Sequence, residues 1–316
     1  MIYKVFVDGQ EGTTGLQINE RLKQRSDIKL LKIDPEKRKD RNERKKLINE
    51  ADIVFLCLPD EAARESVSLL EKDKTRIIDA STAHRTNENW AYGLPELSGY
   101  HRERIRISYK ISVPGCYATG FNVLMYPLIK EGIVPKDYPV TCHAVSGYSG
   151  GGNKLIAQYE TVNPLTESLK SPRFYALGLK HKHLPEMQKI SGLNSPPLFT
   201  PIVGPYYKGM TVAIPLYARL LTDNYCAREI CQFLSDYYKG QHFIKVYPFG
   251  SESMLVNGFL DATGCNGTNN LEITVTGNEE HILLTARFDN LGKGASGAAV
   301  QCMNIIMGLD EATGLE

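Results

Sequence analysis

Short apolar runs alternate with helical patterns over the first third of the chain. The runs span residues 2–8, 28–33, 52–58 and 76–80. Between them, Leu16, Ile18 and Leu22 recur at helical spacing, and residues 61–70 show a second helical pattern. Continuous apolar strands that alternate with helices are typical of a parallel sheet covered on both faces. The pattern therefore predicts a doubly wound, Rossmann-like dinucleotide-binding unit over residues 1–115.

The pattern changes after Cys116. Residues 117–131 predict one helix, because their apolar side chains recur on a common face. Alternating apolar and polar positions then indicate strands at residues 211–220, 244–247, 271–276 and 282–287. Such alternation is typical of antiparallel strands and predicts a second domain of the α+β class with a mostly antiparallel sheet. A final helix of small and apolar residues is expected over residues 297–308.

The composition adds constraints on partners. At 316 residues the chain exceeds the span of one domain, roughly 100–200 residues, which favours two domains. Its formal net charge of +1 gives no general attraction to nucleic acid or to an anionic membrane. No apolar run reaches the ~18 residues of a membrane helix, and the first residues form a strand and a turn rather than a secretory signal. We therefore expect neither a nucleic-acid partner nor a membrane.

Seven cysteines are scattered along the chain without a Cys-x-x-Cys pair. An odd number, in a chain of this length without an export signal, favours reduced thiols and a cytoplasmic location. The spacing also argues against a zinc site of the paired-cysteine kind, so no metal is predicted.

A glycine-rich turn follows the first predicted strand. From Gly9 to Gly15 it has the spacing Gly-x-x-Gly-x-x-Gly, where the standard dinucleotide motif has Gly-x-Gly-x-x-Gly. Glycines allow a close backbone approach to a pyrophosphate, which the following helix binds through its N-terminal N–H groups. A tight turn without a ligand would share this spacing, but its place after the first strand favours a dinucleotide site. The expected cofactor contacts are Gly9, Gly12, Thr13, Thr14 and Gly15.

The choice between NAD and NADP stays open at the end of the second predicted strand. Asp34 follows Gly15 by 19 positions, where an acidic residue usually contacts the ribose hydroxyl of NAD. A basic run that includes Arg38 comes directly after it, and an arginine there can accommodate the 2′-phosphate of NADP. Most of the basic run also fits a solvated surface.

Cys116 stands apart from the other cysteines. Pro114 and Gly115 end an extended segment, and a helix is predicted at or just after the cysteine. A thiol at a helix N-terminus feels the helix dipole and nearby N–H donors, which stabilise the thiolate and make it a nucleophile. The other six cysteines lie mostly in apolar runs and fit buried packing. Small and polar residues surround Cys116, which favours a covalent catalytic role.

A cysteine nucleophile needs an acid–base partner, and two histidines offer one. His181 and His183 lie in a basic, proline-bounded segment with loop-like composition, and His183 is the preferred candidate. Neighbouring lysines disfavour the protonated imidazole and can attract an anionic substrate.

Two further segments have the composition of ligand-binding loops. Residues 146–153 are too rich in glycine for the interior of an element, and Ser149, Gly150 and Gly151 are candidate cofactor contacts. A flexible linker between domains is the alternative. Arg85 follows the fourth predicted strand and is a candidate for bidentate hydrogen bonding to a phosphate or carboxylate. A surface ion pair is the alternative. Arg173 and Lys180 are further candidates for binding the substrate.

Together these motifs resemble those of N-acetyl-γ-glutamyl-phosphate reductase, in its shorter, second type. The resemblance covers nearly the whole chain. Its motifs are residues 9–15, 79–85, 93–97, 113–120, 146–152, 181–186 and 289–297. The cysteine and His-x-His-x-Pro-Glu motifs are specific, whereas the glycine turn is not. One departure is Leu124, where the family usually has a small residue; it changes helix packing and little of the chemistry.

The resemblance implies NADP(H) as cofactor and a step of arginine biosynthesis: reduction of N-acetylglutamyl 5-phosphate to N-acetylglutamate 5-semialdehyde, with release of phosphate. It makes Cys116 the nucleophile that forms a thioester, His183 the acid–base residue and, more loosely, Arg85 a phosphate ligand. It also returns the last helix to the cofactor domain. The expected division is residues 1–115 plus 290–316 for the cofactor, and residues 116–289 for catalysis and dimerisation. Because a sheet-containing second domain commonly supplies a dimer face, a homodimer or homotetramer is expected.

Three alternatives remain. Aspartate-semialdehyde dehydrogenase shares the fold, the cysteine and the cofactor, and differs in its substrate. A cysteine-dependent hydrolase or acyltransferase would need no redox cofactor, which the glycine turn disfavours. A non-catalytic dinucleotide sensor would bind the cofactor without an unusually reactive Cys116. A parallel pathway on a modified glutamate also stays open.

Overall fold

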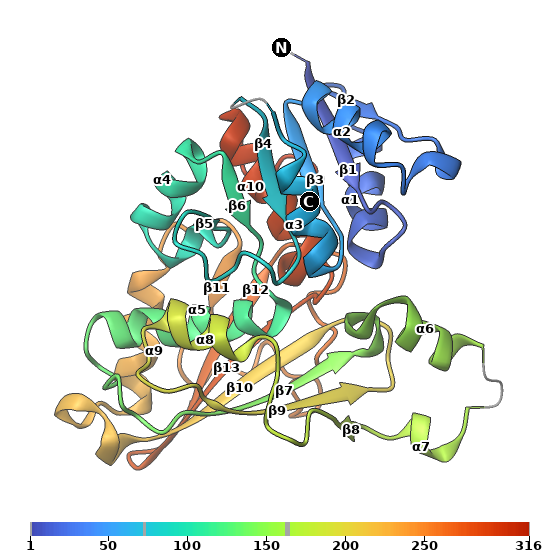
Figure 1. The fold of residues 1–316 in the computed structure, drawn as a ribbon. Helices are drawn as coiled ribbons and strands as arrows, with labels where there is room; N and C mark the ends of the chain where they lie inside the picture. The colour runs from blue at the N-terminus through green and yellow to red at the C-terminus, as the bar shows by residue number, and fades with distance from the viewer. Residues whose placement is uncertain (1, 72–73, 162–164, 316) are drawn as a thin grey trace. The chain divides into compact units, whose positions relative to one another are not determined.

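The computed structural model describes residues 2–71, 74–161 and 165–315. The chain folds into two compact units, one of residues 1–115 with 295–316 and the other of residues 116–294. Each unit is built around its own sheet (Figure 1). Within the described ranges, no helix is both long and apolar enough to cross a membrane.

A six-stranded parallel sheet forms the centre of the first unit, in the order β2-β1-β3-β4-β6-β5. The strands are β1 (Tyr3–Asp8), β2 (Ile28–Leu31), β3 (Ile53–Leu56), β4 (Arg76–Asp79), β5 (Ala91–Tyr92) and β6 (Lys110–Ser112). The four apolar runs of the sequence are confirmed as β1 to β4, and β5 and β6 extend the sheet beyond the pattern. The strand order changes direction between β1 and β3, the position at which doubly wound sheets bind ligands.

Five helices belong to the first unit among the described residues: α1 (Thr13–Lys23), α2 (Arg41–Glu50), α3 (Asp60–Ser68), α4 (Gly99–Ile107) and α10 (Gly297–Met307). The last of these, α10, comes from the C-terminal end of the chain and packs against α1, α4 and β4. Its residues from Gly297 to Ile305 are all buried, including the polar Gln301 and Asn304, whose side-chain amides donate hydrogen bonds.

The second unit contains a mixed sheet of seven strands in the order β11-β12-β13-β10-β7-β9-β8. They are β7 (Thr141–Gly147), β8 (Arg173–Phe174), β9 (Leu198–Gly204), β10 (Met210–Tyr217), β11 (Ile244–Val246), β12 (Leu271–Gly277) and β13 (His281–Phe288). Four of the six neighbouring pairs are antiparallel, which confirms the mostly antiparallel sheet. The two parallel pairs, β11 with β12 and β7 with β9, were not indicated by the sequence.

One face of this sheet is covered by α5 (Cys116–Lys130) and α9 (Ala227–Tyr237), with α8 (Leu184–Ser191) packed against α5 (Figure 1). Strand β10 shows the reason, because Met210, Val212, Ile214 and Leu216 are buried at alternate positions. Helix α5 comes close to the sheet at Gly120, where a Cβ would be 2.7 Å from Val212. Outward side chains of the opposite face, such as Tyr217 and Leu283, are exposed.

The glycine-rich segment expected to lie outside regular elements is partly helical. Residues Tyr148–Gly151 form a short 3₁₀ helix, and α6 (Gly152–Glu160) follows directly, with α7 (Glu167–Lys170) beyond it. The alternative of a linker between domains is wrong, because the segment lies inside the second unit. Gly147 explains part of the glycine content, since a Cβ there would be 2.6 Å from the Tyr207 carbonyl oxygen.

Candidate active site

Cys116 is the first residue of α5 and is half-buried. Because the helix runs for 15 residues, its N-terminal N–H groups and dipole favour the thiolate over the thiol. Gly294 lies directly against the cysteine, since a Cβ built on it would be 2.8 Å from the Cys116 Cβ. A side chain at position 294 would therefore displace the nucleophile.

Two tyrosine hydroxyls lie close to this cysteine. Tyr175 donates its O–H to the Tyr117 oxygen over 3.0 Å, and Tyr117 also hydrogen-bonds Ser146. Burial raises the pKa of both tyrosines, and the charge of Cys116 adds to the effect. Both phenols are therefore protonated at neutral pH and can stabilise a thiolate only as neutral dipoles.

Both predicted histidines pack around Tyr117. The rings of His181 and His183 lie 5.7 Å and 5.8 Å from the Tyr117 ring and 4.7 Å from each other, between centroids. Phe199 on β9 packs against His181 and Tyr117 at 5.2 Å and 5.1 Å. The structure thus brings the His-x-His motif to the tyrosine that follows Cys116 in the chain.

The two histidines differ in their electrostatics. Burial, together with the charge of Lys182, lowers the pKa of His181 to about 4. His181 is therefore neutral at pH 7, and because its Nδ1 accepts the backbone N–H of His183 over 3.2 Å, its proton lies on Nε2. This geometry suits His181 for donating a hydrogen bond rather than for transferring a proton. His183 is buried at the residue before α8.

Four of the remaining cysteines are less suited to nucleophilic chemistry. Burial raises the pKa of the thiols of Cys57, Cys142, Cys231 and Cys265, in the last case to about 12. These four thiols are therefore protonated at neutral pH and inert as nucleophiles. Cys226 also stands at a helix start, as the N-cap of α9, whereas Cys116 lies within the first turn of the 15-residue α5.

The glycine turn of the first unit shapes a cavity of about 540 Å³. Gly9 has φ of 89°, which favours glycine, and a Cβ on it would overlap the Cys57 carbonyl oxygen. A Cβ on Gly15 would overlap the Gly9 carbonyl oxygen. Helix α1 begins at Thr13 after Gly12, which has no side chain to cap the first N–H groups. The helix start can therefore offer these N–H groups to an anion.

In the segment that follows β2, basic rather than acidic side chains line this cavity. Arg38 and Lys39 line it, and Arg38 forms an ion pair with Glu11 of the glycine turn. The Asp34 carboxylate accepts the N–H of Glu36 over 3.0 Å, which caps a short 3₁₀ helix, and Asp34 is not among the lining residues. A turn that excludes a Cβ at Gly9 and Gly15, a helix start without a side-chain cap and two cations together fit the phosphates of a dinucleotide.

The other predicted ligands are spread over both units. Arg85 is buried and donates to the carbonyl oxygens of Val113 and Ala80 over 2.8 Å and 2.9 Å, so the surface ion pair is wrong. Its loop is also fixed by the buried pair of His84 and Asp79, 2.6 Å apart. Its role as a phosphate ligand stays a prediction.

In the second unit, Arg173 on β8 donates to the Tyr159 hydroxyl over 2.8 Å, and Lys180 is exposed. Ser149 accepts the side-chain N–H of Asn290 over 3.0 Å. Gly150 lies beside the same pair, since a Cβ on it would be 3.2 Å from Ser146 Oγ and 3.5 Å from Asn290 Nδ2. A Cβ on Gly151 would be 2.4 Å from Leu155 Cδ2 and 2.7 Å from Leu155 Cβ, so α6 packs closely on this glycine.

Sequence reasoning missed Tyr117, Tyr175 and Gly294. Tyr117 and Gly294 stand inside the motifs of residues 113–120 and 289–297, so a close inspection of those motifs could have found them. Tyr175 carries no local signal, because only the fold brings it from β8 toward the start of α5.

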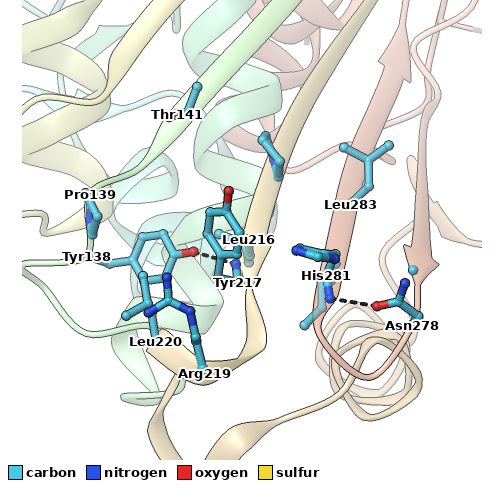
Figure 2. Close-up of a pocket in the computed structure, with 13 residues that line it drawn as sticks. Tyr138, Pro139, Thr141, Leu216, Tyr217, Arg219, Leu220, Asn278, His281 and Leu283 are labelled. Atoms are coloured by element: carbon cyan, nitrogen blue, oxygen red, sulfur yellow. Dashed lines mark hydrogen bonds between the residues drawn. The ribbon is translucent and has the colours of Figure 1, made fainter.

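A second cavity of about 510 Å³ lies at the β10 and β13 ends of the second sheet (Figure 2). Figure 2 shows Tyr217, His281 and Arg219 around it, with the Tyr138 hydroxyl accepting the Tyr217 N–H over 2.7 Å. None of the predicted site residues lines this cavity.

Comparisons with known proteins agree with this arrangement. Residues 4–106 match the NAD binding domain of semialdehyde dehydrogenase, and residues 116–290 match its dimerisation domain. The fold is similar to that of aspartate semialdehyde dehydrogenase II from Vibrio cholerae, complexed with ASA, with a TM-score of 0.69 and 15% identity over 97% of this chain and 98% of that chain. A probable aspartate-semialdehyde dehydrogenase from Pseudomonas aeruginosa gives a TM-score of 0.72 and 16% identity over 97% and 99% of the two chains. Fold and domains thus define the class, an oxidoreductase of the semialdehyde dehydrogenase type.

Relatives of higher identity narrow this class. N-acetyl-gamma-glutamyl-phosphate reductase 2 of Nostoc sp. is 50% identical over 99% of both chains, and the Pseudomonas putida protein of the same name is 46% identical over 98% of both. The chain belongs to the N-acetyl-gamma-glutamyl-phosphate reductase family. This confirms the resemblance inferred from the motifs and the expected nicotinamide cofactor, and it excludes an acyltransferase or hydrolase without a redox cofactor.

Proposed function

We propose that this protein reduces N-acetylglutamyl 5-phosphate to N-acetylglutamate 5-semialdehyde with NADPH, in arginine biosynthesis. The observation that carries the proposal is a cysteine at a helix N-terminus, beside the His-x-His motif, in a chain that also has an NAD binding domain. The names of the relatives supply the substrate, and the 15–16% identity to aspartate-semialdehyde dehydrogenases supports only the fold.

The chemistry follows from the Cys116 thiolate. His183 takes the thiol proton, and the sulfur attacks the acyl carbon of the substrate, so that a carbon–sulfur bond forms and phosphate leaves. Bound NADPH supplies the hydride that reduces the resulting thioester. The tetrahedral adduct on Cys116 then loses its carbon–sulfur bond, releasing the aldehyde, and His183 returns the proton to the sulfur. A thioester accepts hydride far more readily than a carboxylate, so the covalent intermediate keeps the acyl group reducible after phosphate has left.

Other residues of the second unit orient this chemistry. The N–H groups at the start of α5 can stabilise oxyanion charge on the substrate. The neutral His181 and the Tyr117 hydroxyl supply hydrogen-bond donors that keep their protons at neutral pH, while Tyr175 donates its own O–H to Tyr117. Arg85 of the first unit is proposed to bind an anionic group of the substrate, as are Arg173 and Lys180 of the second unit. Ser149, Gly150 and Gly151 are proposed to contact the cofactor.

The first unit is proposed to select NADP(H) over NAD(H). Gly9, Gly12, Thr13, Thr14 and Gly15 would hold the pyrophosphate, and Arg38 with Lys39 would bind the 2′-phosphate. Arg38→Ala is expected to weaken NADP binding about 10-fold and to leave NAD binding unchanged. Lys37→Ala is the matched control, because Lys37 is exposed on the same short helix and does not line the cavity.

We also propose a homodimer or homotetramer in the cytoplasm. Residues 1–115 plus 290–316 would bind the cofactor, and residues 116–289 would carry catalysis and dimerisation. The exposed face of the second sheet, with Leu198, Tyr217 and Leu283, offers an apolar surface for self-association in a unit matched by a dimerisation domain. The cavity of Figure 2 lies at one end of that face.

The test runs the reaction backward, which avoids the unstable acyl phosphate. Purified protein is mixed with N-acetylglutamate semialdehyde, phosphate and NADP, and nicotinamide reduction is followed by absorbance. We expect phosphate-dependent reduction that Cys116→Ser abolishes, with little activity on NAD or aspartate semialdehyde. Activity only with aspartate semialdehyde would keep the mechanism and refute the substrate. No turnover with either aldehyde, despite NADP binding, would favour a dinucleotide sensor.

A further inference from the structure

The loop between β11 and β12 carries a rigid apolar turn at Val256–Phe259. Val256 and Phe259 exchange two backbone hydrogen bonds of 2.9 Å and 3.0 Å. Asn257 and Gly258 between them both have positive φ, 51° and 82°, as in the tight hairpin turn that Asn-Gly favours. The turn presents Phe259 and Val256 to solvent, 75% and 60% exposed.

A buried ion cluster fixes the base of this turn. Arg287 on β13 donates to the Met254 carbonyl on one side of the turn and to the Asp261 carbonyl and carboxylate on the other, over 3.1–3.4 Å. The same guanidinium is held by Glu272 of β12, 2.9 Å from its Nε. One buried arginine thus clamps both ends of the turn to the central strands of the sheet, so the exposed phenylalanine stands on a rigid support.

We propose that this turn is an anchor that inserts Phe259 into a second copy of this chain. An exposed aromatic side chain on a preorganised support is typical of the residues that contribute most to interface affinity. Residues 254–260 contain no charged side chain, which fits an apolar protein surface rather than an anionic ligand. The turn lies within residues 116–290, the region matched by the dimerisation domain, which favours another copy of this chain as the occupant. The inference rests on the proposed self-association and adds the residue that anchors it.

Sedimentation velocity on the full-length protein tests the anchor. We expect Phe259→Ser to raise the dimer dissociation constant by about 30-fold or more, because burial of an anchoring aromatic is lost. Ile107→Ser is the matched control, since Ile107 is 54% exposed at the end of α4 in the first unit. As a second measurement, Phe259→Trp adds a fluorophore on the turn to the native Trp90, and the emission in excess of the wild-type signal should shift to shorter wavelength as the protein concentration rises.

The outcomes separate the anchor from the wider proposal. A wild-type protein that is monomeric at all concentrations would refute self-association and the anchor together. A wild-type dimer that Phe259→Ser leaves intact, with an emission of Trp at position 259 that does not change on dilution, would refute the anchor alone. A Phe259→Ser variant that stays dimeric but has a higher KM for substrate would show that the turn covers a ligand. This result would also refute the anchor.

Discussion

The two units of this protein build their functional sites in different ways. In the first unit, strand β1, the glycine turn and the start of α1 follow one another in the chain, so a short segment contains most of the proposed phosphate contacts. In the second unit, Cys116, Tyr175, His183 and Gly294 come from segments far apart in sequence. The first site depends on local turn geometry, whereas the second depends on the packing of the whole sheet.

Glycine serves both units, for different reasons. Gly15 lets the start of α1 lie against the Gly9 carbonyl, and so shapes a turn open to a ligand. Gly294 lets the chain lie against Cys116, and so positions a reactive side chain from behind. If this distinction holds, a methyl group at each position should impair one unit and leave the other intact.

The largest expected effect belongs to the second unit. His183→Asn should lower kcat of the reverse reaction by about 10²–10⁴-fold, because the proposed acid–base residue is lost. His181→Asn is the matched variant: its side-chain oxygen can still accept the His183 N–H, and kcat should fall by no more than about 10-fold. NADP binding, measured by titration of protein fluorescence, should be unchanged in both. Equal losses of kcat in the two variants would contradict the division of roles between the histidines.

A methyl group in the first unit should separate binding from reactivity. Gly15→Ala forces the glycine turn away from α1 and should weaken NADP binding by about 30–100-fold, because hydrogen bonds to a charged phosphate are lost. The alkylation rate of Cys116 by iodoacetamide should stay at the wild-type value. A slower alkylation in a variant with unchanged melting temperature would show that the two sites are coupled, which would contradict their independence.

The sequence predicted the first unit more completely than the second, for a physical reason. A parallel strand buried on both faces is a continuous apolar run, so β1 to β4 could be recognised, as could the turn after β1. The short strands β5 and β6 are too short to show a pattern. In the second unit β10, β11, β12 and β13 were evident from alternation, whereas β7 and β9 were not.

The candidate site of the second unit was visible only in part. Cys116 and His183 stand in motifs whose residue types suggest their chemistry. Tyr175 and Phe199 have no such motif, because their place depends on the pairing of β8 with β9 and of β9 with β7. The low pKa of His181 likewise follows from burial, which no local pattern reports.

A methyl group against the nucleophile should impair the reactivity of Cys116 and leave NADP binding unchanged, the opposite of the effect expected for Gly15→Ala. Gly294→Ala places a Cβ against the Cys116 Cβ and should lower kcat by roughly 10-fold and slow alkylation of Cys116, because near-attack geometry is lost. NADP affinity should remain that of the wild type. Loss of cofactor binding together with activity would indicate general unfolding, which circular dichroism on the same sample would reveal.

The smallest expected effect is a pH dependence confined to the second unit. The pKa of His181 is lowered from 6.5 to about 4 in the folded protein, so between these values the unfolded chain binds a proton that the folded chain does not. The free energy of unfolding should therefore fall as pH drops from 6.5 to 4, with no further contribution from this group below about pH 4. His181→Asn should remove this contribution and raise the melting temperature at pH 5, relative to wild type at the same pH, by roughly 2–4 °C. Hydrogen exchange should place the difference at α8 and not at α1. If the melting temperatures of the two proteins changed by the same amount from pH 7 to pH 5, His181 would have the same pKa in the folded and unfolded chain. That result would remove the electrostatic reason for assigning proton transfer to His183.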